Sequence, residues 1–165
     1  MSFVRVLRHL VSPPWLVRRK FPKAALDKIE AAIKDSEQRH RGEIRFAVEH
    51  ALEFLAVLRG LTPRERALEV FALLRVWDTE ENTGILVYVQ LVDRHIEIVA
   101  DRGIARLIAQ SEWDAICRRM ERAFAEGRHE EGVIAGIGEI SDLLARHFPA
   151  RADNPNELPD TPATL

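Results

Sequence analysis

The stretch ENTGILVYVQLVDRHIEIVADRG, residues 81–103, decides the fold of this chain. Residues 84–92 are almost continuously apolar, which is typical of a central strand that is covered on both faces. A tight turn at Asp93 and Arg94 follows, and residues 96–100 then form the antiparallel neighbour of the first strand. The stretch therefore predicts a β-hairpin within a sheet.

A strand and a helix precede this hairpin. Residues 43–49 alternate as a half-buried strand does, and one side of it carries Ile44, Phe46 and Val48. Residues 63–76 form a helix, because its start has a capping box with proline at the first helical position, in Thr62, Pro63 and Glu65. A strand, helix and strand in this order cross over right-handedly, so we expect the first two strands to be parallel.

Further helices complete the domain. One begins at Pro22 and ends near Gly42, and two more follow the hairpin, the first with an apolar stripe from Trp113 to Phe124 and the second ending at Phe148. The order helix, strand, helix, strand, strand, helix, helix predicts the α/β class. We expect a three-layer α/β/α sandwich with a small mixed sheet over residues 22–148.

The two ends of the chain differ in charge. Residues 1–21 form a basic arm without acidic residues, and its cations are Arg5, Arg8, Arg18, Arg19 and Lys20. The arm has two interpretations: a short amphipathic helix docked on the domain, or a peripheral contact with an anionic membrane. Residues 149–165 are acidic and rich in proline, which predicts a disordered tail.

Composition excludes several classes of protein. The 24 Lys and Arg against 26 Asp and Glu give a net charge of −2, so nothing points to nucleic-acid binding. No apolar run is long enough to cross a bilayer, and the arm is unlike a cleaved signal. The single cysteine, Cys117, suits a reducing cytoplasm, and its place on the apolar stripe favours a core residue over a nucleophile.

The topology brings two acidic loops to one end of the sheet, since the second strand begins where the third ends. Asp78, Glu80 and Asn82 alternate in the first loop, so an extended loop would direct three oxygen ligands to one point, and Asp101 would add a fourth. Ca²⁺ or Mg²⁺ is the cation that such ligands suit, with water completing the shell. A solvated acidic loop without an ion is the alternative.

Arg102 also has two interpretations. It can pair with a neighbouring carboxylate beside a cap formed by Asp101, or it can orient a phosphate beside a cation. No Ser, His or Cys is visibly placed to form a covalent phosphoenzyme. His129 belongs to a helix start, while His50 and His95 lie at the opposite end of the sheet.

The segment RERALEVFALLRVWDTEENTGILVYVQLVDRHIEIVADRGI, with the helices that follow it, resembles the TPM-domain family. The resemblance covers about residues 22–148, and its most specific parts are Asn82, Gly84, the hairpin and the turn at residues 101–103. It implies an α/β/α sandwich, divalent-cation binding as in some members, and the acid phosphatase activity proposed for a plant member. Because this chain has neither the signal peptide nor the C-terminal membrane helix of other members, it is similar to shorter, cytoplasmic bacterial forms.

Three hypotheses of function follow. The first is a divalent-cation-binding interaction or regulatory domain, whose protein partner the sequence does not identify. The second is a metal-assisted acid phosphatase with Arg102 at its site. The third is an ion-independent module that docks on a protein or a membrane surface through residues 1–21.

Overall fold

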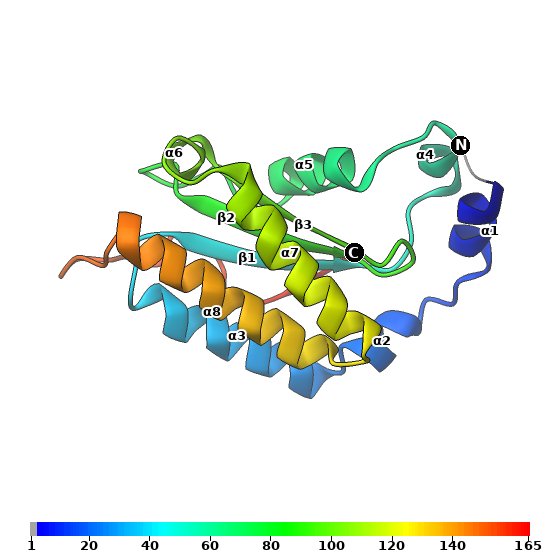
Figure 1. Cartoon of the computed structure of the whole chain (residues 1–165), viewed down its shortest axis with the longest axis horizontal. Coiled ribbons are helices and arrows are strands. Elements are labelled where there is room, and N and C mark those ends of the chain that lie inside the picture. Colours follow the sequence, from blue (N-terminus) through cyan, green and yellow to red (C-terminus); the bar gives the residue numbers. More distant parts are fainter. Residues whose placement is uncertain (1–2) are drawn as a thin grey trace.

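The computed structural model describes the chain from residue 3 to residue 165. Runs of two or three helices are separated by single strands or by a strand pair (Figure 1). Their order is α1 (Phe3–Val11), α2 (Leu16–Lys20), α3 (Lys23–Glu37), β1 (Glu43–Glu49), α4 (Phe54–Leu58), α5 (Pro63–Leu73), β2 (Gly84–Gln90), β3 (His95–Ala100), α6 (Arg102–Ala105), α7 (Gln110–Ala125), α8 (His129–His147) and β4 (Ala163–Thr164).

The strands form one mixed sheet in the order β3-β2-β1-β4. β1 and β2 are parallel, with Glu43 opposite Gly84 and Glu49 opposite Gln90. β2 and β3 are antiparallel and form the hairpin that the sequence predicts. The predicted directions of these three strands are therefore confirmed. The capped helix α5 forms the crossover between the two parallel strands.

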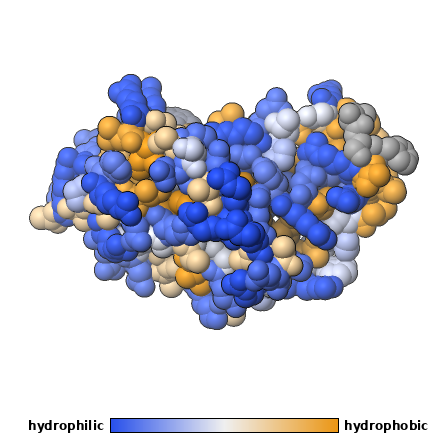
Figure 2. All heavy atoms as spheres, in the orientation of Figure 1, coloured by the Kyte–Doolittle hydropathy of each residue, from blue (hydrophilic) through white to orange (hydrophobic). Residues whose placement is uncertain are grey.

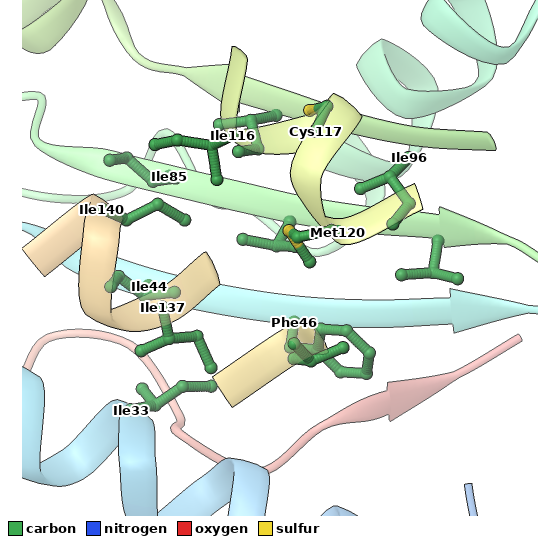
Figure 3. Close-up of a cluster of buried hydrophobic side chains, with 14 of the residues drawn as sticks. Ile33, Ile44, Phe46, Ile85, Ile96, Ile116, Cys117, Met120, Ile137 and Ile140 are labelled. Atoms are coloured by element: carbon green, nitrogen blue, oxygen red, sulfur yellow. The ribbon is translucent and has the colours of Figure 1, made fainter. Parts of the chain in front are cut away.

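Helices cover both faces of the sheet, as the predicted three-layer sandwich requires. On one face α3, α7 and α8 pack against the apolar side chains of β1 and β2 (Figures 1 and 3). On the other face α5 packs against Leu86 and Tyr88 of β2. Cys117 is buried in α7, and burial raises the pKa of its thiol to about 12, in keeping with a core residue.

The tail differs from the expectation of disorder. Its last residues form β4, which pairs in parallel with Ala47 and Val48 of β1, and Leu158 is 7% exposed. The guanidinium of Arg45 donates hydrogen bonds to the carbonyls of Pro159 and Thr161. The tail binds β1 in two ways, through backbone pairing at its edge and through the side chain of Arg45. The composition of the tail does not reveal these contacts.

The basic arm is docked on the domain through α1. Arg5 and His9 both bind the carboxylate of Asp93 in the β2–β3 turn, at 2.8 and 3.1 Å, while Val6 packs with Leu52 and Val57. This matches the first of the two interpretations of the arm. No helix in the part of the chain that the structure describes has the length and apolar content needed to cross a membrane.

Candidate functional site

Two loops meet at one end of the sheet, where β2 begins and β3 ends. The amide of Gly103 donates a hydrogen bond to the carbonyl of Asn82 at 3.1 Å, and the amide of Asp101 donates one to the carbonyl of Gly84 at 2.8 Å. The Nε of Arg102 donates to Oδ1 of Asn82 at 2.8 Å. The structure thus brings together Asn82, Asp101 and Arg102, three of the residues that the sequence singles out.

Two glycines allow the loops to come this close. A Cβ on Gly84 would lie 1.9 Å from the carbonyl oxygen of Val76, and a Cβ on Gly103 would lie 2.5 Å from that of Asn82. Backbone atoms cannot move aside as the end of a flexible side chain can. Both positions therefore require glycine for close approach: a side chain at Gly103 would push the two loops apart, and one at Gly84 would push the first loop away from the start of β2.

Asp101 carries the least satisfied group of the site. It caps α6, with Oδ1 accepting a hydrogen bond from the amide of Arg102 at 2.7 Å. Its second oxygen, Oδ2, is buried and has no hydrogen-bond partner among the described residues, and the same is true of Oγ1 of Thr83. A buried carboxylate oxygen without a partner loses hydration with no compensation, so this atom favours a cation or a donor beside it.

Asp78 and Glu80 lie differently from the prediction. The loop is turned rather than extended: Asp78 donates its amide to the carbonyl of Arg75 at 2.9 Å, and both Arg75 and Asn82 have positive φ. The exposed carboxylate of Asp78 pairs with Arg75 at 2.8 Å. The amide of Glu80 donates to Glu157 at 2.8 Å.

The predicted ligands therefore divide into two pairs. Asn82 and Asp101 lie at the contact between the loops, whereas Asp78 and Glu80 lie on the outer part of the first loop. Within residues 3–165, no three His, Cys, Asp or Glu side chains are grouped so that they could hold a metal ion. An ion bound here would need backbone oxygens and water in addition to side chains.

Glu81 was missed by the sequence reasoning. Its carboxylate pairs with Arg41 and, at 2.7 Å, with Arg151. Its carbonyl oxygen would lie 2.6 Å from a Cβ on Gly103, so the residue also belongs to the contact between the loops. No pattern could have indicated this role, because both arginines are remote in the sequence.

A buried acidic cluster lies at the start of β1. Burial raises the pKa of Glu37 to about 9, although one of its oxygens accepts a hydrogen bond of 2.7 Å from the amide of Ile44. Burial also raises the pKa of Glu43, whose Oε2 accepts from the amides of Glu157 and Leu158. These contacts hold the tail, so the cluster is part of the attachment of the tail to the domain.

Comparisons with known proteins bear on this arrangement. The NMR structure of the BA42 protein from the psychrophilic bacterium Bizionia argentinensis sp. nov. is similar, with a TM-score of 0.76 and 30% identity, covering 86% of this chain and 93% of that one. No curated protein matches the sequence. The family model of the TPM domain matches residues 21–143. Since this match spans well over half of the chain, the chain belongs to the TPM-domain family.

Proposed function

We propose that this TPM domain binds a divalent cation where its two loops meet, and that the bound ion serves an interaction or regulatory role. The observation that carries the proposal is Oδ2 of Asp101, which is buried without a hydrogen-bond partner among the described residues. A hard cation such as Ca²⁺ or Mg²⁺ would supply the missing partner, because both prefer oxygen ligands.

Asp101 and Asn82 would form the protein part of the site. The amide oxygen of Asn82 accepts one hydrogen bond, from Arg102, and has a second lone pair to offer. Backbone oxygens and water would complete the shell, as is common for Mg²⁺. The donor set therefore fits a hard cation better than a soft one, which would need sulfur or imidazole ligands.

Asp78 and Glu80 remain candidates for the outer side of the same site. The pair of Asp78 with Arg75 is exposed on both sides, at 51% and 67%, and such surface pairs contribute only about 0–1 kcal/mol. The carboxylate of Asp78 could therefore release Arg75 and bind an ion with little loss of free energy. Binding that orders the first loop around these carboxylates would give the ion a means to change the surface that a partner meets.

Isothermal titration with Ca²⁺ and Mg²⁺ tests the proposal. Asp101→Asn keeps the shape of the side chain and its bond to the amide of Arg102 but removes the charge, so we expect heat of binding and thermal stabilisation to disappear. Asp142→Asn is the matched control, because Asp142 is an exposed aspartate of α8 that pairs with Arg39 and makes no contact with Asn82 or Asp101 among the described ion pairs and hydrogen bonds. Asp78→Asn measures whether the outer carboxylate joins the site.

Paramagnetic Mn²⁺ gives an independent measurement of where the ion binds. We expect it to broaden the amide signals of Asn82 and Gly103 before those of His95 and Ile96, at the far end of β3. Absence of heat, stabilisation and broadening at millimolar ion would overturn the proposal, as would equal binding by the Asp101→Asn variant.

A metal-assisted phosphatase is the second candidate at the same loops. Arg102 is exposed, and only its Nε is engaged, so its terminal nitrogens have no partner within the described part of the chain and could bind a phosphate. The expected result is metal-dependent turnover of an aryl phosphate that falls in Asp101→Asn and Arg102→Met. Turnover that stays at the wild-type level in both variants would indicate a contaminating enzyme and remove this candidate.

A further inference from the structure

One end of the molecule exposes an unusual number of large apolar side chains. They lie on α1, on α4 and at the start of α2, and their exposed fractions range from 37% for Leu58 to 67% for Val11. We call this set the apolar end surface, and it consists of Val4, Leu7, Leu10, Val11, Trp15, Phe54, Leu55 and Leu58. Hydrophobic residues gather at this end in Figure 2, beside α1 and α4.

The docking of α1 explains why these side chains face outward. Arg5 and His9 bind Asp93, and Val6 is buried against α4, so one side of the helix is fixed against the domain. The remaining apolar residues of α1 then lie on the free side, and the neighbouring helix α4 exposes Phe54 and Leu55 in the same way. Contiguous apolar patches are rare on soluble monomers and usually mark an interaction site.

The segments that carry the apolar end surface are themselves mainly basic. Arg8, Arg18, Arg19 and Arg59 are exposed, and the guanidinium of Arg19 lies 5.6 Å from the ring centroid of Trp15. Glu53 is the one acidic residue in residues 3–20 and 53–59, whereas the whole chain has a net charge of −2. The same segments therefore carry both the exposed apolar side chains and an excess of positive charge, while Asp93 is paired with Arg5 and His9.

We propose that the apolar end surface docks on an anionic lipid bilayer. Interfacial helices insert an apolar face into the region between headgroups and acyl chains, while arginines on their flanks bind anionic headgroups. Trp15 suits this boundary, since its ring is amphipathic. A second copy of this chain is a poorer occupant, because a symmetric contact would bring the two arginine sets together.

The surface is far from the proposed cation site. α1 is bound at the β2–β3 turn, where β2 ends, whereas Asn82 precedes the start of β2, so the two regions lie at opposite ends of the sheet (Figure 1). Membrane docking through α1 and α4 would leave the loops at Asn82 and Asp101 facing away from the bilayer. The two proposals can therefore fail independently.

Vesicle co-sedimentation of the full chain tests the proposal, with phosphatidylcholine vesicles and with vesicles that also contain phosphatidylglycerol. We expect binding to the anionic vesicles that added salt weakens. The double substitution Leu7→Ser and Val11→Ser, at positions 48% and 67% exposed, should weaken binding about tenfold, since it removes two large apolar side chains from the contact.

The chain offers a matched control on α5. Leu68 and Leu73 are 49% and 63% exposed but lie outside the apolar end surface, so Leu68→Ser with Leu73→Ser should leave vesicle binding unchanged. Arg18→Glu with Arg19→Glu should remove the preference for anionic lipid. A blue shift of tryptophan emission on vesicles should be lost in Trp15→Phe.

Several outcomes would overturn the proposal. They are no binding to anionic vesicles, equal loss in the α1 and α5 variants, or equal binding of neutral and anionic lipid. Light scattering adds one more: a dimer that the substitutions at Leu7 and Val11 dissociate would assign the surface to a second copy of the chain. Circular dichroism of each variant shows that the substitutions leave the fold intact.

Discussion

The Nε of Arg102 donates a hydrogen bond of 2.8 Å to Oδ1 of Asn82, and this bond joins two loops that are 20 residues apart in the sequence. Asn82 also has a φ of 55°, in the left-handed region. Its side chain and its backbone therefore both contribute to the contact between the loops.

Substitution of Asn82 separates these two contributions. Asn82→Ala and Asn82→Gly both remove the bond to Arg102, but only alanine is strained by the left-handed backbone conformation at this position. We expect the alanine variant to be less stable than the glycine variant by about 1 kcal/mol in urea unfolding. Equal stabilities would mean that the backbone at this position relaxes.

Gly84→Ala should be strongly destabilising. The new Cβ would lie 1.9 Å from the carbonyl oxygen of Val76, so the loop or the first residue of β2 must move, at a cost of roughly 3 kcal/mol or more. Gly138→Ala is the control, because nothing lies within 4 Å of its Cβ and it is inside α8. There alanine should stabilise the protein by about 0.5–1 kcal/mol.

Glu37 predicts a loss of stability at high pH. Its pKa is raised from 4.5 to about 9 in the folded protein, so the folded state keeps a proton that the unfolded state has released. The contribution of Glu37 to the free energy of unfolding is complete below pH 4.5 and disappears as the pH rises toward 9. Glu37→Gln should flatten this dependence in thermal melts.

The pH range of that experiment matters because of His40. Burial lowers the pKa of His40 to about 4, so its contribution is lost as the pH falls below 6.5. Melts above pH 6.5 therefore exclude the contribution of His40. The hydrogen bond with Glu97 raises the pKa of His95 above 6.5, so His95 also contributes in this range, and the difference between the wild type and Glu37→Gln is what isolates Glu37. If the melting temperature of the wild type does not change between pH 6.5 and pH 9, the raised pKa of Glu37 is contradicted.

Leu158→Ala tests the attachment of the tail. Leu158 is 7% exposed and packs beside Leu86 and Tyr88, so its truncation should cost about 2–3 kcal/mol. Leu165→Ala, at a position 37% exposed in the same tail, should cost less than about 1 kcal/mol. If both variants are as stable as the wild type, the tail is not held in solution.

The sequence predicts the centre of this fold well because local patterns carry it. The continuous apolar run of β2 and the capping box of α5 are short-range signals, and both elements form where expected. β4 could not be predicted in this way, since its partner on β1 lies more than a hundred residues earlier and two residues are too few to show a periodic pattern.

The same distinction applies to the candidate site. The meeting of the loop at Asn82 with the turn at residues 101–103 follows from the order and direction of the strands, and the structure has it. The directions of Asp78 and Glu80 were predicted from an extended loop. The actual loop contains turns with a left-handed residue at Arg75, so alternation does not apply there.

The placement of β4 on β1 has a consequence for the behaviour of the protein at high concentration. An uncovered edge strand is a template to which another chain can add its own strand. β4 occupies part of that edge on β1, and on the opposite side side chains bind the backbone of β3, with Arg64 on the carbonyl of Ile98 and Glu121 on the amide of Ile96. These contacts leave fewer backbone groups of β1 and β3 open to a strand of another molecule, which lowers the tendency to aggregate edge to edge.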